Sequence, residues 1–344
     1  MFSVKGSRLF LFTLLVAVLA LSSAQSVYAS WSTATRITSD TGESSFPSVA
    51  SSSTGQYVYM VWKDNTPGNF EIYLKRSTNY GVSWSSALRM TLNTGSSERP
   101  SVACSSNGQY VYLVWADDTP GNYEIYFKRS TNYGVNWGSA AKITTNTGDS
   151  GKPGVACSSN GQYVYLAWDD NTPGNYEIYF RRSTNYGASW GTALRMTVNA
   201  GGSWKARVAC SSNGRYVYLA WYDNTLGNSE IYFRRSTNYG VNWGAAVRIT
   251  TNTGYSAYPS VACSSNGQYV YLVWADDTPG NYEIYFKRST NYGVNWGSAA
   301  KITTNTGDSG KPGVACSSNG QYVYLAWDDN TPGNYEIYFR RSTN

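Results

Sequence analysis

The sequence predicts an all-β protein, a six-bladed β-propeller whose blades are four-stranded antiparallel sheets. The first observation is a 53-residue repeat, marked by six equally spaced tryptophans: Trp62, Trp115, Trp168, Trp221, Trp274 and Trp327. The second is the identity of residues 100–185 with residues 259–344. The third is a content of 31 Tyr, 13 Trp and 33 Gly with almost no helical periodicity, which is typical of short strands and tight turns. Repeats of this length indicate a propeller. The alternative fold is a parallel β-helix, which uses shorter repeats.

Each repeat contains four segments with strand character, described here for the second copy. Residues 101–105 form the first segment, and the turn signal Ser106-Asn107-Gly108 separates it from residues 110–115, which are apolar on both faces. Residues 123–129 resume strand character after an acidic loop, and residues 140–144 are the expected fourth, outer strand. Four antiparallel strands repeated six times are the pattern of propeller blades.

The first 29 residues have the pattern of a secretory signal peptide. Lys5 and Arg8 precede an apolar run over residues 9–21, and Val27-Tyr28-Ala29 supplies small residues for cleavage. The run is too short for a membrane span, and no later stretch is apolar for long enough. We therefore expect a secreted, extracellular or cell-surface protein without a membrane span.

Residues 30–344 are predicted to form a single propeller domain that is closed by its own N-terminal strand. Residues 31–38 are similar to residues 84–91, the outer-strand segment of the first repeat, while the chain stops inside a sixth copy of the turn that precedes this segment. We expect residues 31–38 to complete the last blade and hide its edge. The alternative is that the sequence is a piece of a longer array.

Several classes of chemistry are disfavoured by composition. The chain has no histidine, which removes the usual general base, a Ser-His-Asp triad and the commonest zinc ligand. Its small positive net charge has no basic runs, so no nucleic-acid partner is expected. Five cysteines are predicted to be unpaired packing residues in a monomer: Cys104, Cys157, Cys210, Cys263 and Cys316. An intermolecular bridge or a metal ring is the alternative.

The turn after the third strand reads Ser-x-Asn-x-Gly-x-x-Trp in five copies. It resembles the Asp-box, or BNR repeat, of sialidase-like β-propellers, with Asn in place of Asp. Asn can still bond the turn backbone, Gly supplies a positive φ, and Trp is expected to pack the hairpin onto its blade. The predicted structural residues are Ser77, Asn79, Gly81, Trp84, Ser130, Asn132, Gly134, Trp137, Ser183, Asn185, Gly187, Trp190, Ser236, Asn238, Gly240, Trp243, Ser289, Asn291, Gly293 and Trp296. A less specific resemblance, in W-x-D-N-x-x-G-N-x-E-I-Y, is to repeat-type surface propellers of archaea and bacteria.

The acidic residues of each repeat are predicted to be structural. Asp117 and Asp118 should cap the loop between the second and third strands, and Glu124 should pair with a Lys or Arg of a neighbouring strand. No cofactor is expected. The alternative is a weak calcium site formed by the loop oxygens.

Variation between the repeats is concentrated just before the first strand, on the face that carries the 2–3 and 4–1 loops. This rim is the predicted ligand-binding site, and its residues are Phe46, Arg99, Lys152, Trp204, Lys205, Arg207, Tyr258 and Lys311. The alternative is that exposed loop tips simply tolerate substitution.

The resemblance to sialidases implies glycan chemistry, but their catalytic pattern is incomplete here. A sialidase grips a carboxylate with three arginines, whereas only Arg99 and Arg207 lie on the predicted rim, and Arg36-Ile37-Thr38 replaces the family's Arg-Ile-Pro. We therefore predict a non-catalytic extracellular module that binds a glycan or a protein, with repeated weak sites acting together. The alternative is a divergent sialidase-like exo-glycoside hydrolase.

Overall fold

The computed structural model describes residues 33–343, so the predicted signal peptide lies outside the described residues. The chain divides into two units, residues 1–39 and residues 40–344. In the first unit the described residues 33–39 form no strand, and Arg36 Nε donates a hydrogen bond to the carbonyl of Thr38 at 2.7 Å. The second unit contains all the regular structure described below.

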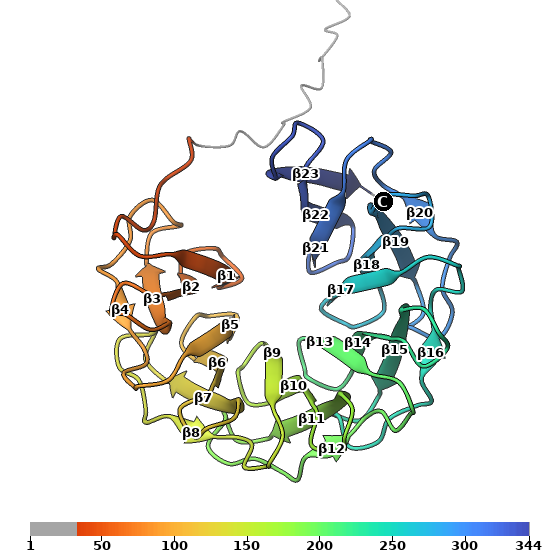
Figure 1. Cartoon of the computed structure of the whole chain (residues 1–344). Helices are drawn as coiled ribbons and strands as arrows, with labels where there is room; N and C mark the ends of the chain where they lie inside the picture. Colours follow the sequence, from red (N-terminus) through yellow and green to blue (C-terminus); the bar gives the residue numbers. More distant parts are fainter. Residues whose placement is uncertain (1–32, 344) are drawn as a thin grey trace, which may run out of the picture. The chain divides into compact units, whose positions relative to one another are not determined.

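Residues 40–343 form six antiparallel sheets, and the innermost strand of each points toward a common axis (Figure 1). The first blade contains β1 (Ser44–Ser51), β2 (Val58–Asp64), β3 (Glu71–Ser77) and β4 (Leu88–Arg89). The second to fifth blades repeat this order: β5 (Ser97–Cys104), β6 (Val111–Asp117), β7 (Glu124–Ser130) and β8 (Ala141–Lys142); β9 (Ser150–Cys157), β10 (Val164–Asp170), β11 (Glu177–Ser183) and β12 (Leu194–Arg195); β13 (Ser203–Cys210), β14 (Val217–Asp223), β15 (Glu230–Ser236) and β16 (Val247–Arg248); β17 (Ser256–Cys263), β18 (Val270–Asp276), β19 (Glu283–Ser289) and β20 (Ala300–Lys301). The sixth blade contains β21 (Ser309–Cys316), β22 (Tyr322–Asp329) and β23 (Glu336–Thr343). The predicted six-bladed all-β propeller is therefore confirmed, and these residues contain no helix that could span a membrane.

The second strand of each of the second to fifth blades is covered on both faces, as its apolar sequence predicts. Every residue of β6 is buried, and so is every residue of β10. The apolar clusters lie between neighbouring blades: Val114 and Ile125 of the second blade pack with Val164 and Trp168 of the third. Each of the second to fifth blades thus supplies one half of two successive cores, and the first and sixth blades contribute to one core each.

Neighbouring blades are also joined by hydrogen bonds that recur with the repeat. Tyr112 Oη donates to the carbonyl of Gly161 at 2.6 Å, the Ser106 N–H donates to the carbonyl of Ser159 at 2.7 Å, and Arg129 Nη1 donates to the carbonyl of Tyr186 at 2.8 Å. Because both faces of the second to fifth sheets are covered by neighbouring blades, removing one of these blades would expose two apolar surfaces.

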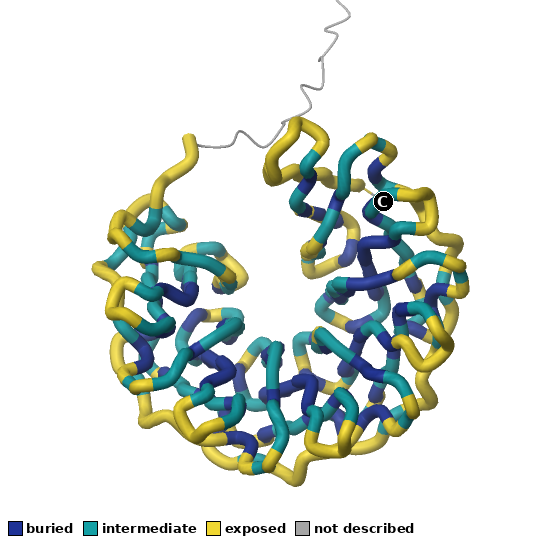
Figure 2. Tube along the Cα trace, in the orientation of Figure 1, coloured by how far each residue is buried: buried dark blue, intermediate teal, exposed yellow. Residues whose placement is uncertain are grey.

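The sixth blade differs from the other five. Its sheet has three strands, so the predicted four-stranded blade is found in five copies, and residues 33–38 form no outer strand where one was expected. β23 is exposed throughout (Figure 2): Ile337 is 78% exposed, whereas its copy Ile284 is fully buried. On the first blade, Val49 is 62% exposed and its copy Val102 is 6% exposed. The described residues 33–38 are not paired with β23, so they form no strand. Closure of the last blade by residues 31–38 stays a prediction, and its test is given in the Discussion.

The five cysteines are unpaired and partly buried, and each is the last residue of an innermost strand, namely β5, β9, β13, β17 or β21. Burial raises the pKa of the Cys104 and Cys316 thiols to about 12. Such thiols stay protonated at neutral pH and are poor nucleophiles.

Candidate functional site

Each innermost strand begins with a β-bulge, and one residue of each bulge has a left-handed backbone. These residues are Phe46, Arg99, Lys152, Lys205, Tyr258 and Lys311, with φ between 44° and 55°. The pairing register shifts at the same place in every blade, for example between Glu98 and Ser101. A positive φ is unfavourable for residues other than glycine, and bulges re-aim side chains. Six long side chains at positions that suit glycine favour a role for the side chains themselves.

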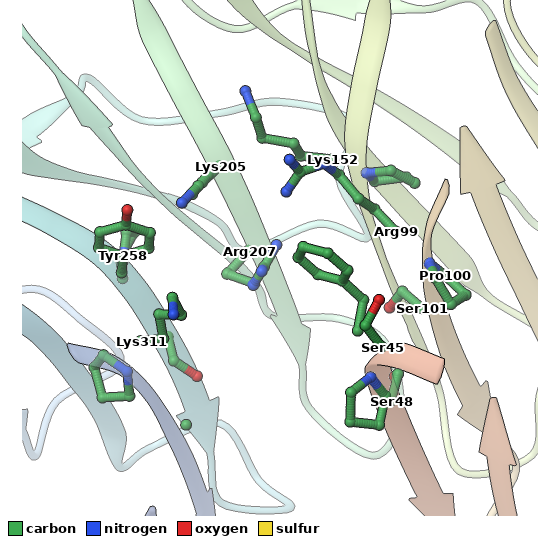
Figure 3. Close-up of a pocket in the computed structure, with 17 residues that line it drawn as sticks. Ser45, Ser48, Arg99, Pro100, Ser101, Lys152, Lys205, Arg207, Tyr258 and Lys311 are labelled. Atoms are coloured by element: carbon green, nitrogen blue, oxygen red, sulfur yellow. The ribbon is translucent and has the colours of Figure 1, made fainter. Parts of the chain in front are cut away.

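The bulge residues line one cavity of about 820 Å³ around the axis, together with Arg207 and five prolines (Figure 3). Figure 3 shows Arg99, Lys205 and Arg207 directed toward a shared space, with Tyr258 and Lys311 across from Arg99. Trp204, the eighth residue of the predicted rim, does not line this cavity. The structure thus brings seven of the eight predicted residues together.

Trp204 belongs instead to an aromatic cluster of the third and fourth blades. Its ring centroid lies 5.5 Å from that of Tyr222 and 6.2 Å from that of Tyr176. A Cβ on Gly202 would lie about 2.2 Å from the Trp204 ring, so only glycine leaves room for the indole there. The side chain lies against its own loop rather than toward the axis.

Two of the lysines of the cavity are neutralised by carboxylates of their own blades. Lys152 Nζ lies 3.0 Å from Asp169 Oδ2, and Lys311 Nζ lies 2.9 Å from Asp328 Oδ2. Among the described residues, Arg99, Lys205 and Arg207 form no ion pair, and we call these three residues the cation cluster. The cavity is therefore charged unevenly around its axis.

Aromatic rings compensate part of this charge. Lys205 Nζ lies 3.3 Å from the centroid of the Tyr258 ring, and the Arg99 guanidinium lies 4.9 Å from that of Phe46. Such contacts stabilise a cation by about 0.5–2 kcal/mol. Because the rings carry no net charge, the cations can still pair with an anion.

Burial, together with crowding of positive charge, lowers the pKa of Lys205. Burial, followed by the charges of Lys152, Arg99 and Arg207, lowers its pKa from 10.5 to about 7, although Asp169 acts in the opposite direction. Burial also raises the pKa of Asp169, against the pull of the Lys152 ammonium. Strongly shifted pKa values of this kind are enriched at functional sites, which makes Lys205 a candidate functional residue.

A second variable ring, missed at the sequence level, decides which cations are paired. It is the residue after each core tryptophan, namely Lys63, Ala116, Asp169, Tyr222, Ala275 and Asp328. Each lies opposite the residue before a bulge, as Asp169 lies opposite Gly151. The sequence contained the signal that could have identified this ring, because the position varies among acidic, basic, aromatic and small residues in otherwise near-identical copies.

The acidic loop residues support the rim. Asp117 is buried, and its carboxylate accepts hydrogen bonds from Ser97 Oγ at 2.7 Å, Asn93 Nδ2 at 2.6 Å and the Thr119 N–H at 3.0 Å. The buried Glu124 pairs with Lys142 of the outer strand at 3.2 Å, as predicted. These carboxylates tie the 4–1 loop to the 2–3 loop and so hold the bulge in place. No group of three or more His, Cys, Asp or Glu within residues 33–343 could hold a metal ion, and the weak calcium site stays a prediction.

The Asp-box turns lie between the third and fourth strands, at the end of each blade opposite the bulge. Ser130 Oγ accepts the Gly134 N–H at 3.0 Å, and Asn132 Oδ1 accepts the Asn136 N–H at 2.9 Å. The tryptophan also contacts the neighbouring blade. The Trp190 ring packs edge-on against Phe127 of the preceding blade, with 4.9 Å between the ring centroids. The prediction that this tryptophan packs onto its own blade was thus incomplete, because its ring also contacts the preceding blade.

We expect Lys205→Gly to raise the melting temperature of the protein. Glycine relieves a backbone with φ of 52°, which costs about 1 kcal/mol or more for other residues, and it removes a crowded charge. The folded state depresses the pKa of Lys205, so charging it disfavours folding below about pH 7, and this penalty fades as the pH rises toward 10.5. The gain in melting temperature should therefore be largest at acidic pH.

Lys311→Gly is the matched control for this prediction, because its φ is 44° and its ammonium pairs with Asp328. Its gain from the relieved backbone should be smaller, because the variant also loses this exposed ion pair, and it should not change between pH 10 and pH 6, where both partners stay charged. A Lys205→Gly protein that melts at or below the wild-type temperature between pH 6 and pH 10 would contradict the idea that this side chain is kept at the expense of stability.

No protein-family model matches the sequence, and no curated protein is similar to it at a significant level. Solved structures share its fold. The Hadza microbial sialidase Hz136 matches with a TM-score of 0.56 at 16% identity, over 87% of this chain and 65% of that protein. The intramolecular trans-sialidase of Ruminococcus gnavus, solved with oseltamivir carboxylate, matches with a TM-score of 0.61 at 12% identity, over 88% and 94% of the two chains. A family PL25 ulvan lyase matches with a TM-score of 0.58 at 9% identity, over 84% and 78%.

These similarities concern the fold: the chain has a six-bladed β-propeller fold that it shares with these sialidases. It spans slightly less than two thirds of the length of Hz136. At such identities the likeness concerns the fold, and function has to be argued from the site.

Proposed function

We propose that this protein is an extracellular, non-catalytic propeller that binds an anionic glycan in its axial cavity. The observation that carries the proposal is the convergence of the cation cluster with Phe46 and Tyr258 on one cavity, each bulge residue being held in a backbone conformation that disfavours its side chain. Guanidinium and ammonium groups pair with carboxylates and sulfates, while the faces of sugar rings pack on aromatic rings. Several structural neighbours are described as sialidases or a polysaccharide lyase, which supports a carbohydrate ligand.

The test is binding of the mature protein to an acidic polysaccharide at low salt, with neutral dextran as the comparison. Arg99→Ala combined with Arg207→Ala should weaken binding about tenfold, because each exposed charge pair contributes roughly 0–1 kcal/mol. Added salt should weaken wild-type binding as well. Isothermal titration calorimetry measures both effects.

Arg215→Gln is the matched control for the double change. Arg215 lies in the turn between β13 and β14, at the other end of the blade, and the equivalent residue of the other five blades is Gln. This variant should bind like the wild type. Equal binding to neutral dextran, or an intact affinity in the Arg99→Ala/Arg207→Ala protein, would refute the proposal, and release of a fluorogenic sialoside would favour the hydrolase instead.

A further inference from the structure

The six bulge positions are equivalent in sequence, but their charges are not equivalent in space. Phe46 and Tyr258 are uncharged, and Lys152 and Lys311 are paired with carboxylates. A further lysine near the rim, Lys63, is paired with Glu98 at 3.1 Å and lies 3.6 Å from the Phe70 ring centroid. What remains is the cation cluster, which belongs to the second and fourth blades.

The fold does not require the side chains of the cation cluster, because the equivalent positions of the other blades carry other residues. The bulge position accepts Phe, Tyr, Arg and Lys, and the position of Arg207 is Ser or Gly in the other five blades. Arg207 is exposed to the cavity, and among residues 33–343 its side chain donates a hydrogen bond only to the adjacent carbonyl of Ala206, at 3.2 Å. Like charges that gather without a partner raise the free energy of the folded protein, and a bound anion would lower it.

Asp169 limits how much negative charge the cluster can accept. Its buried Oδ2 accepts hydrogen bonds from Lys152 Nζ at 3.0 Å and from the Lys205 N–H at 3.1 Å. Its Oδ1 has no hydrogen-bond partner in the described chain. The Asp169 carboxylate disfavours the binding of several adjacent anions beside it. It leaves the guanidinium groups of Arg99 and Arg207 free to bind one anion.

From this arrangement we propose that the cation cluster binds a single oxyanion group of the ligand, a carboxylate or a sulfate ester, so that the cavity holds one charged sugar residue off its axis. The proposal rests on the proposed function. It replaces the expectation of several equivalent weak sites around the ring. The second and fourth blades grip the anion from two sides, and the rings of Phe46 and Tyr258 flank it.

The titration of Lys205 gives the site a pH signature. The groups that face this amine are Arg99 of β5, Lys152 of β9, Asp169 of β10, Arg207 of β13 and Tyr258 of β17. A bound anion favours the charged amine, so affinity should be greatest below about pH 7 and should fall as the pH rises through that value. Arginine stays charged throughout this range.

The experiment compares two lysines that occupy the same position of the repeat. Lys205→Met should weaken binding about tenfold at pH 6, as expected for loss of a charge-assisted contact, and should flatten the pH profile between pH 6 and pH 9. Lys311→Met should cause a smaller loss and keep the wild-type pH profile. Asp169→Asn should strengthen binding, because it removes the competing carboxylate. Hyaluronan, which carries only carboxylates, and dextran sulfate, which carries only sulfates, decide between the two oxyanions.

The outcomes separate this inference from the function on which it rests. Equal losses in Lys205→Met and Lys311→Met, with the Arg99→Ala/Arg207→Ala protein still impaired, would overturn the single-anion site and leave a glycan-binding ring. A stoichiometry of several short acidic oligosaccharides per chain would overturn it too. Absence of binding to both polymers at low salt would instead refute the proposed function itself.

Discussion

Deleting residues 30–38 should remove most of the cooperative stability of the mature protein. In five blades the outer strand covers a buried isoleucine and pairs with a buried glutamate, as Arg195 pairs with Glu177 at 2.9 Å. Arg36 and Thr38 stand at the equivalent positions for the sixth blade, and Arg36 Nε donates to the carbonyl of Thr38 as Arg195 Nε donates to that of Thr197. If this segment completes the last blade, its loss costs several kcal/mol of burial. Calorimetric unfolding of the two proteins measures the effect.

A point substitution gives the matched control for closure. Ile337→Ala should cost about 2–5 kcal/mol if the sixth blade is covered in solution, the same as Ile178→Ala in the third blade. The structure exposes Ile337 and buries Ile178 completely, so the two values should differ strongly if the blade is open. An unchanged unfolding temperature, both after the deletion and in the Ile337→Ala protein, would exclude closure.

Asp117→Ala should destabilise the protein by about 3–5 kcal/mol and weaken glycan binding. The buried carboxylate joins the 4–1 loop to the 2–3 loop through Asn93, Ser97 and Thr119, and its loss leaves several buried donors without an acceptor. Ser97 lies two residues before Arg99 in β5, so the bulge that directs Arg99 into the cavity would lose its support. Chemical denaturation and calorimetric titration measure the two effects.

Asp118→Asn is the control for this prediction, because four other blades carry Asn at the equivalent place. Asp118 Oδ1 accepts the Ser96 N–H at 2.6 Å, and in the third blade Asn171 Oδ1 accepts the Asp149 N–H in the same way. Asp118→Asn should therefore unfold like the wild type. A similar free energy of unfolding for Asp117→Ala and Asp118→Asn would show that the carboxylate of Asp117 is dispensable.

Most of the fold could be predicted from the sequence because its determinants are local and repeated six times. The turn Ser106-Asn107-Gly108, the apolar run before Trp115 and the five Asp-box turns each specify backbone geometry over a few residues. The predicted strands at 110–115 and 123–129 match β6 and β7 to within two residues at either end. The outer strand is shorter than its predicted range, since only Ala141 and Lys142 pair with β7.

By itself, the sequence determined the repeat, the propeller and the face that carries the variable rim. Only the tertiary structure decided which rim residues act as free charges. Lys152 and Lys205 have the same side chain, the same repeat position and nearly the same φ, yet the first is paired with Asp169 and the second lies against Tyr258 and near two arginines. The physical reason is that the free charge of a cation depends on neighbours within a few ångströms, and here those neighbours come from other strands and other blades.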